Sequence, residues 1–345
     1  MPNKGEHWEP ACPIHFVEGA KPWILSRGFA KSSARVFDAR HRGEPFDLVL
    51  SESMAAIGLV DLPREARPPL VYWNHGFELE HFLNQCQDAT GLVDLLKLPA
   101  IKFPEAIWRS WLERRIVNTA DLCIGAIPRL LDLWKRWHGA DPEKLMVFRN
   151  AVDIAQVPTR PLPKVPNVMM AAVLVKQKGI QDGLKALGRL VREGMQFRVT
   201  LVGDGPYRST LESLASRLGP ENHITWLGHI PYAQFQLQYA EADLFLMPTR
   251  RYEGGPLVIS EALGSRVPVV ATDRGGTADS VGPAGIVVPV SDIDALACAV
   301  RHILGDAELH AQLRETARKQ WEDLFSPSAS RRNLEAMLGR LGLAG

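Results

Sequence analysis

The chain has 345 residues, more than one ordinary domain needs and enough for two. Apolar residues make up 46% and charged residues 23%, as in globular proteins, and the net charge of +1 gives no global attraction to nucleic acid, so we expect no nucleic-acid partner. The opening MPNKGEHWEP lacks the apolar stretch of a signal peptide, and no apolar run is long enough to span a membrane. The four cysteines form no CxxC pair and read as free thiols, which favours the cytoplasm, and they show no metal-binding spacing, so we expect no metal site.

Short apolar runs alternate with helical patterns in the first half of the chain. Strands are predicted at 14–18, 46–50, 70–74, 121–125 and 145–149. Helices are predicted at 26–42, 105–119 and 128–138. Continuous apolar strands joined by helices are typical of parallel sheets covered on both faces, so this half predicts an α/β domain.

The second half repeats the alternation. Its strands are predicted at 168–175, 197–202, 224–228, 243–247, 267–271 and 285–289. Its helices are predicted at 179–194, 207–218, 232–241, 256–265, 292–304 and 307–322. We therefore predict an α/β fold of two doubly wound, Rossmann-like domains.

A proline-rich segment separates the two halves. Residues 156–167, QVPTRPLPKVPN, contain four prolines, which remove backbone donors and continue neither a helix nor a sheet. We place an N-terminal domain at 1–155, a C-terminal domain at 168–325, and a last helix in 326–345 that packs back towards the N-terminal domain. Ligands of parallel sheets bind beyond the carboxyl ends of the strands, so we expect a site between the domains.

The segment 248–276, PTRRYEGGPLVISEALGSRVPVVATDRGG, carries the strongest functional pattern. Glu253 and two glycines follow a predicted strand, and Glu261 comes eight residues after Glu253 in the next helix. Glycines let the backbone approach a ligand, and a helix start offers free N–H groups to a phosphate. Two spaced carboxylates suit sugar hydroxyls, whereas alone they would more simply be solvated charges on a buried helix.

This segment resembles the EX7E signature of family 4 glycosyltransferases, retaining enzymes of the GT-B architecture that use nucleotide sugars. The resemblance implies that Glu253 faces the hydroxyls of the donor sugar and that Glu261 binds the ribose. The backbone implied to cradle the donor sugar and its diphosphate comprises Gly254, Gly255, Pro256 and Leu257.

Other stretches resemble the same family in the same order, from about residue 45 to 325. LVGDGP at 201–206 resembles the strand and turn beside the nucleoside, and WLGHIP at 226–231 the loop that covers the base. RNAVD at 149–153 resembles the segment before the interdomain linker. NHG at 74–76 resembles the His-Gly site of the N-terminal domain. The residues implied in these matches are Gly203, Asp204 and Gly205 for the donor, and His75 for catalysis beside the donor sugar and the acceptor.

The sequence departs from the family pattern at two places. The family has Gly-Arg-Leu-Val-x-x-Lys-Gly after the first strand of its second domain, and here Lys178 matches the lysine while Val173 replaces the arginine. An arginine makes a forked contact to phosphate that valine cannot make, unless Lys176 compensates. The family also opens with a first Rossmann strand followed by a Gly-rich acceptor loop; the run at 14–18 is no clear match to that strand and no Gly-rich loop precedes residue 46, so we expect a shortened or degenerate N-terminus.

Basic and aromatic residues are mixed in the segment 97–115, KLPAIKFPEAIWRSWLERR. Its apolar positions 107, 108, 111 and 112 form a helical stripe. Two interpretations remain open. Either the helix faces the core with a solvated basic face, or it lies on an anionic membrane and places the protein at the membrane's inner surface.

The resemblance implies a retaining hexosyltransferase that acts from a nucleotide-sugar donor on a saccharide or lipid-linked hydroxyl, in cell-surface polysaccharide or glycolipid synthesis. It implies no metal and no other cofactor, since a helix dipole and basic residues compensate the diphosphate. Two alternatives remain open. One is a catalytically impaired homologue that binds a sugar nucleotide or a partner protein, as Val173 suggests. The other is a sugar-nucleotide epimerase of similar shape.

Overall fold

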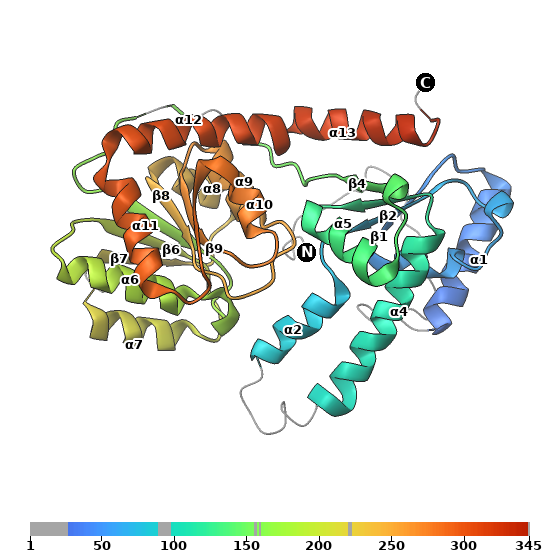
Figure 1. Cartoon of the computed structure of the whole chain (residues 1–345), viewed down its shortest axis with the longest axis horizontal. Coiled ribbons are helices and arrows are strands. Elements are labelled where there is room, and N and C mark those ends of the chain that lie inside the picture. Colours follow the sequence, from blue (N-terminus) through green and yellow to red (C-terminus); the bar gives the residue numbers. More distant parts are fainter. Residues whose placement is uncertain (1–26, 89–97, 155–156, 159, 220–222, 344–345) are drawn as a thin grey trace.

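The computed structural model describes residues 27–88, 98–154, 157–158, 160–219 and 223–343, which form two α/β domains side by side (Figure 1). Within these residues, the N-terminal domain holds a four-stranded sheet and the C-terminal domain a six-stranded sheet, and all strand pairs are parallel. Separate apolar clusters pack on the two sheets. The predicted α/β class is therefore confirmed.

The N-terminal sheet has the strand order β1-β2-β3-β4 in the part of the chain described. Its strands are β1 (Val49–Glu52), β2 (Leu70–Asn74), β3 (Leu122–Gly125) and β4 (Leu145–Val147). Its α-helices are α1 (Arg27–Gly43), α2 (Glu78–Asp88), α4 (Phe103–Thr119) and α5 (Pro128–Leu133). The four described strands lie in the sheet in the same order as in the sequence. The strand predicted at 14–18 lies outside the described residues.

The C-terminal sheet has the order β10-β9-β8-β5-β6-β7, so its first strand lies in the middle and the order reverses between β5 and β8. This is the doubly wound arrangement that the sequence predicts. Its strands are β5 (Asn167–Ala171), β6 (Arg198–Val202), β7 (Ile224–Gly228), β8 (Leu244–Met247), β9 (Val269–Thr272) and β10 (Gly285–Val288). Its helices are α6 (Ile180–Arg192), α7 (Arg208–Leu218), α8 (Tyr232–Glu241), α9 (Leu257–Gly264), α10 (Thr277–Val281), α11 (Ile293–Gly305) and α12 (Ala307–Leu324).

The last helix, α13 (Pro327–Arg340), crosses from one domain to the other (Figure 1). It follows α12, which packs on α9 of the C-terminal domain. Met337 of α13 is buried against β2 and β3 of the N-terminal sheet, and the Arg340 guanidinium donates to the Leu145 carbonyl at 2.9 Å. The chain therefore connects the two domains a second time after the linker.

Two strand boundaries differ from the sequence prediction. The strand predicted at 168–175 ends at Ala171, because the N–H of Val175 turns back to the carbonyl of Val173 and Leu174 bonds to Asp204 beyond β6. The strand predicted at 46–50 begins pairing only at Val49. None of the helices in the described ranges combines the length and the apolarity that crossing a membrane would require.

Candidate functional site

A cavity of about 330 Å³ lies at the carboxyl ends of β5 and β8, where the C-terminal strand order reverses. Such a switch point is where open parallel sheets bind ligands. The segments after both strands and the first turn of α9 form its walls. Among the residues predicted for the site, its lining contains Lys178, Glu253, Pro256 and Leu257.

We call this cavity the donor-side cavity, because the family resemblance implies donor contacts for residues that line it. Two neighbours fix Glu253 in it. Its Oε1 accepts hydrogen bonds from Lys178 Nζ at 2.8 Å and from Thr249 Oγ1 at 3.0 Å. Lys178 belongs to the 3-10 turn η6 (Lys176–Lys178) after β5, whereas Glu253 follows β8. The fold therefore brings together two residues that lie far apart in the sequence.

The first turn of α9 presents backbone donors to the same cavity. Its N-cap is Pro256, and no side chain of the described residues caps it. Leu257 and Val258 line the cavity at the positive end of the helix dipole. The turn therefore has free N–H groups that suit an anion such as a phosphate.

Gly254 lies where the two domains touch. A Cβ atom built on this residue would lie 1.5 Å from the carbonyl oxygen of His75 in the N-terminal domain. Gly255 has a φ of 111°, which other residues rarely adopt. The two glycines thus allow a close approach of backbones that no side chain permits.

The turn after β6 owes its glycines to packing against the segment after β5. A Cβ atom on Gly203, whose φ is 122°, would lie 1.9 Å from the carbonyl oxygen of Ala172, and one on Gly205 would lie 2.6 Å from that of Leu174. Asp204 accepts a bond from its neighbour's N–H and lies 3.4 Å from the Arg208 guanidinium. The turn supports the wall of the donor-side cavity without lining it.

Glu261 lies within α9 and is held by two tyrosines of α8. Tyr232 donates to its Oε1 at 2.9 Å, and Tyr239 donates to its Oε2 at 3.0 Å. Burial raises the pKa of Glu261, and the two hydroxyls oppose this shift. Burial and the Glu261 carboxylate raise the pKa of Tyr232 to about 12. Glu261 lines neither the donor-side cavity nor the interdomain cavity described next. A ribose, the partner predicted for Glu261, would therefore have to share its carboxylate with Tyr232.

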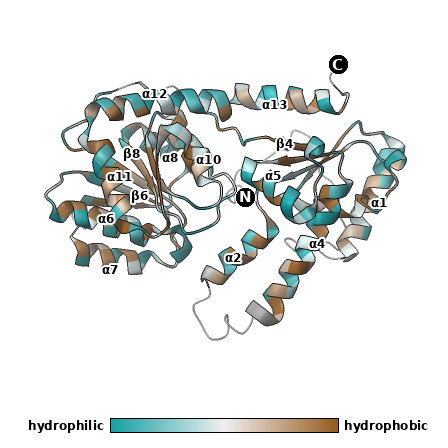
Figure 2. Cartoon of the chain, in the orientation of Figure 1, coloured by the Kyte–Doolittle hydropathy of each residue, from teal (hydrophilic) through white to brown (hydrophobic). Residues whose placement is uncertain are grey.

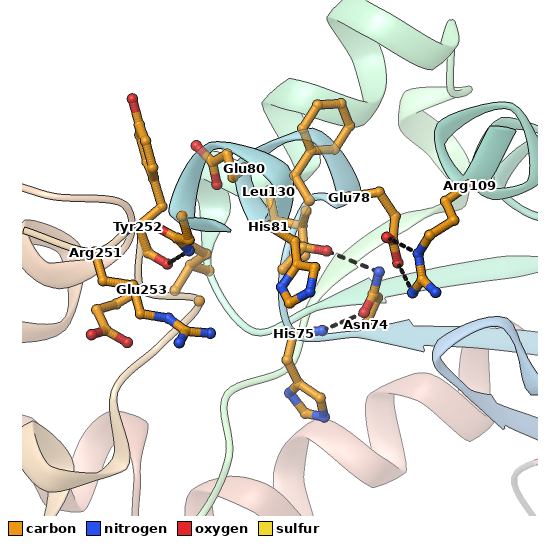
Figure 3. Close-up of a pocket in the computed structure, with 15 residues that line it drawn as sticks. Asn74, His75, Glu78, Glu80, His81, Arg109, Leu130, Arg251, Tyr252 and Glu253 are labelled. Atoms are coloured by element: carbon orange, nitrogen blue, oxygen red, sulfur yellow. Dashed lines mark hydrogen bonds and ion pairs between the residues drawn. The ribbon is translucent and has the colours of Figure 1, made fainter. Parts of the chain in front are cut away.

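A second cavity of about 270 Å³ lies between the domains (Figure 3). Its walls come from the loop after β2, from α2 and α4, and from the loop between β8 and α9. Glu253 lines both cavities, so this carboxylate stands at the boundary between them. His75 and Gly254, which the sequence also predicts for the site, line the second cavity.

His75 is held through its neighbours rather than by a strong partner of its own ring. The backbone N–H of His75 donates to the Oδ1 of Asn74 at 2.9 Å, and the ring Nδ1 lies 3.3 Å from the side-chain amide of Asn150. Its Nε2 lies 3.5 Å from the Glu52 carboxylate. The ring therefore remains accessible in the interdomain cavity.

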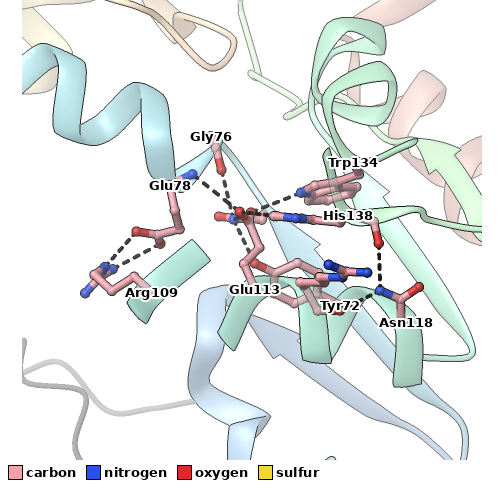
Figure 4. A network of polar contacts seen from close by, with 10 residues as sticks. Tyr72, Gly76, Glu78, Arg109, Glu113, Asn118, Trp134 and His138 are labelled. Atoms are coloured by element: carbon pink, nitrogen blue, oxygen red, sulfur yellow. Dashed lines mark hydrogen bonds and ion pairs between the residues drawn. The ribbon is translucent and has the colours of Figure 1, made fainter. Parts of the chain in front are cut away.

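The buried carboxylate of Glu113 holds the Asn74-His75-Gly76 turn after β2 in place (Figure 4). Glu113 of α4 is fully buried and accepts hydrogen bonds from the Asn74 amide at 3.1 Å and the Trp134 indole at 3.0 Å. His138 Nε2 lies 3.0 Å from its other oxygen. Burial, with the Glu113 charge, raises the pKa of Tyr72 well above its usual value. This network anchors the Asn74-His75-Gly76 turn from below.

Val173 and Lys176 occupy open positions near the donor-side cavity. Val173 lines the cavity and is 62% exposed, so its side chain is not part of the core. Lys176 is exposed and does not line the cavity, and its carbonyl accepts from the Gln181 amide. The compensation suggested for Lys176 stays a prediction.

Several residues at the second cavity escaped the sequence analysis, above all those of α2, a helix that was not predicted. His81 and Asn84 of α2 line the cavity, as does Arg251 of the C-terminal domain. Arg109, read from the sequence only as part of a basic helix, forms a forked ion pair with Glu78 at 2.7 and 3.0 Å. The signal missed was the helical pattern directly after the Asn-His-Gly turn.

Two α/β domains with a site at their interface define the class of GT-B glycosyltransferases, and comparison with known proteins agrees. The family model described as Glycosyltransferase Family 4 matches residues 3–156, and the one described as Glycosyl transferases group 1 matches residues 157–320. The chain belongs to the glycosyltransferases of the family 4 type.

Curated relatives include bacterial glycosyltransferases named for glycolipid and exopolysaccharide synthesis. A GDP-mannose-dependent alpha-(1-6)-phosphatidylinositol monomannoside mannosyltransferase of Mycolicibacterium smegmatis is 35% identical over 46% of this chain and 44% of its own length. A putative colanic acid biosynthesis glycosyltransferase, WcaL of Salmonella typhimurium, is 29% identical over 60% of this chain and 54% of its own. The chain thus spans about half the length of these relatives.

Solved structures share the fold. Sucrose-phosphate synthase from Thermosynechococcus elongatus has a TM-score of 0.74 at 20% identity, over 98% of this chain and 87% of its own. Anabaena HepE in complex with UDP has a TM-score of 0.71 at 21% identity, over 89% of this chain and 82% of its own. These likenesses confirm the predicted GT-B architecture.

Proposed function

We propose that the chain transfers a hexose, with retention of configuration, from a nucleotide sugar to a hydroxyl of a saccharide or glycolipid. The observation that carries the proposal is Glu253, which lines both cavities and pairs with Lys178 in one of them. A carboxylate at the boundary of a donor site and an acceptor site can bind the hydroxyls of the transferred sugar. The names of the relatives point to cell-surface polysaccharide or glycolipid synthesis.

The donor-side cavity suits a diphosphate without a metal ion in this proposal. Lys178 supplies a positive charge that it shares with Glu253, and the first turn of α9 supplies N–H groups and the helix dipole. These groups compensate the charge that grows on the diphosphate as the glycosidic bond breaks. Glu261 contributes a carboxylate to the ribose, and the Asp204 turn supports the nucleoside side.

The acceptor hydroxyl enters from the second cavity, beside His75. The bond between the anomeric carbon and the diphosphate breaks, the acceptor oxygen bonds to that carbon on the face that the diphosphate leaves, and the departing diphosphate takes the proton of the hydroxyl. A separate general base is therefore not needed. His75, held by the Asn74 turn, positions the sugar and the acceptor.

The proposal is tested by supplying UDP-glucose or GDP-mannose with methyl glycosides or a bacterial lipid extract as acceptors. We expect release of nucleoside diphosphate and a product whose new linkage keeps the donor's anomeric configuration, read by NMR. Binding of nucleotide without transfer would support the impaired homologue instead. Conversion of the donor sugar without an acceptor product would support the epimerase.

We further propose that the helix pair α2 and α4 contacts an anionic membrane. The pair projects from the N-terminal domain and carries hydrophobic residues along its length (Figures 1 and 2). Trp108 packs against the core and Leu112 is buried, so only part of the predicted stripe faces the protein. The exposed apolar residues of the pair are Leu83, Phe103, Ile107 and Trp111, and the exposed Ile101 lies in the π-helical turn η3 (Leu98–Lys102) directly before α4.

Vesicle sedimentation tests the membrane contact. The protein should pellet with phosphatidylglycerol vesicles, and Ile107→Ser with Trp111→Ser should remove most of the binding. Trp137→Ser is the matched control, because Trp137 is as exposed as Trp111 but lies elsewhere on the domain. Equal loss with the control, or no vesicle binding at all, would contradict the contact.

A further inference from the structure

The acidic groups around the second cavity are already neutralised by neighbours. Glu78 is forked by Arg109, Glu80 pairs with Arg129, and Glu253 pairs with Lys178. Each of these carboxylates therefore brings its own cation. None of them leaves a negative charge that the cavity would have to offer to a ligand.

Arg251 supplies the cavity with a positive charge that is not cancelled in this way. Among the described residues, no carboxylate lies within ion-pair distance of its guanidinium. Figure 3 shows this side chain reaching from the C-terminal domain towards His81 and His75. The neighbouring Arg250 is different, since it is forked by the buried Asp182 at 2.7 Å.

Hydrogen bonds fix the backbone around Arg251 and thereby the point from which its side chain enters the cavity. The backbone N–H of Arg251 donates to Thr249 Oγ1 at 3.1 Å. The next residue, Tyr252, exchanges two hydrogen bonds with the Asn84 side chain of α2, at 2.8 and 3.1 Å. The loop is thus tied to the N-terminal domain on one side and to Glu253 on the other.

His81 lies across the cavity from Arg251 and completes a site for a negative group. Partial burial lowers the pKa of His81, Glu78 opposes this, and Arg109 and Arg251 lower it further. The ring is therefore mostly neutral at pH 7 and can donate one N–H without adding a permanent charge. The net charge of the cavity comes from Arg251.

Resting on the proposed function, we infer that Arg251, with His81, makes the second cavity select an acceptor that carries an anionic group. The shared chemistry is a carboxylate or phosphate oxygen that accepts hydrogen bonds from a guanidinium. Such a group has two sources in an acceptor, the carboxylate of a uronic acid or the phosphate that joins a saccharide to a lipid. A smaller pocket of about 40 Å³ between α2 and α4 shares Glu78, His81 and Arg109 with the lining of the cavity.

Titration of the whole protein with small probes tests this inference. The nucleotide site is first saturated with UDP or GDP, so that the probes cannot occupy it. Methyl glucuronide, glucose 6-phosphate and the neutral methyl glucoside are then compared by calorimetry or NMR. We expect at least one anionic probe to bind about tenfold or more tightly than the neutral probe, as one charge-assisted contact provides.

Variants of Arg251 assign the preference. Arg251→Gln should remove it, Arg251→Lys should keep part of it, and Arg192→Gln, an exposed arginine on α6, should leave it unchanged. Preference for the glucuronide identifies a uronic acid, and preference for the phosphate ester identifies a phosphate-linked acceptor. No preference in the parent protein, or a preference that survives Arg251→Gln, would overturn the inference.

The same titrations separate this inference from the proposed function. Nucleotide binding without anion preference would defeat the acceptor assignment alone. Absence of nucleotide binding in the parent protein would defeat the proposed function. A loss of nucleotide affinity in Arg251→Gln would move Arg251 into the donor site and overturn its role in acceptor choice.

Discussion

Replacing Val173 with arginine should increase the rate at which the nucleotide sugar is cleaved to release nucleoside diphosphate. Val173 lines the donor-side cavity together with Lys178, and the sequence departs from its family here by lacking an arginine. The valine is 62% exposed, so a longer side chain can extend into the cavity without displacing core residues. The guanidinium would then face the diphosphate as charge develops on it.

The magnitude follows from the environment of the position. A hydrogen bond to a charged group contributes about 1.5–3 kcal/mol, and an exposed position falls at the lower end because water screens the charge. About 1.5 kcal/mol lowers the barrier enough for roughly a tenfold faster step. Val173→Lys adds the charge without the fork, so we expect a smaller gain from it.

The assay is continuous release of nucleoside diphosphate from UDP-glucose or GDP-mannose, measured beside the melting temperature. Val165→Arg is the control, since Val165 is an exposed valine in the linker. A folded Val173→Arg protein with no gain in rate, or an equal gain in Val165→Arg, would refute the reasoning. The charge of the diphosphate would then be compensated elsewhere.

Three further substitutions examine the remaining site residues. Glu253→Gln should lower turnover by about a hundredfold while nucleoside diphosphate affinity changes little, because its contact is to the sugar; equal losses in kinetics and calorimetry would contradict this. Glu261→Ala should weaken nucleoside diphosphate binding by about 1.5–3 kcal/mol in calorimetry, and an unchanged affinity would remove it from the ribose site. Gly254→Ala should lower turnover and leave the domains more open in small-angle scattering, because its Cβ would meet the His75 carbonyl; Gly305→Ala, with open space around it, is the control.

Much of the fold could be predicted because its strands are continuous apolar runs between clear breaks. All ten strands of the described chain overlap a predicted run, and the proline-rich linker separates the two sheets. Glu253 and Lys178 could each be singled out through the family resemblance, since both lie in segments with recognisable local patterns, whereas their ion pair appears only in the structure.

The second cavity could not be read from the sequence, because its residues meet only when the domains face each other. His81 and Asn84 lie on a helix whose pattern is mostly polar, and Arg251 is an ordinary loop residue until Asn84 fixes the adjacent backbone. The contact of Gly254 with the His75 carbonyl likewise joins two loops about 180 residues apart. Local propensity carries no information about such contacts.

The two passages of the chain between the domains contact each other beside the linker. The N–H of Val152, before the linker, donates to the carbonyl of Phe325, between α12 and α13, at 2.9 Å. Because the chain connects the domains twice, the two domain faces that line the cleft stay at a high effective concentration for each other. This holds even if the contacts between those faces are weak. Polar contacts between them, such as the Arg149–Asp279 ion pair and the Asn84–Tyr252 hydrogen bonds, can exchange with water when the domains part. Under the proposed function, the cleft can therefore open for nucleotide exchange while this double connection keeps its halves aligned.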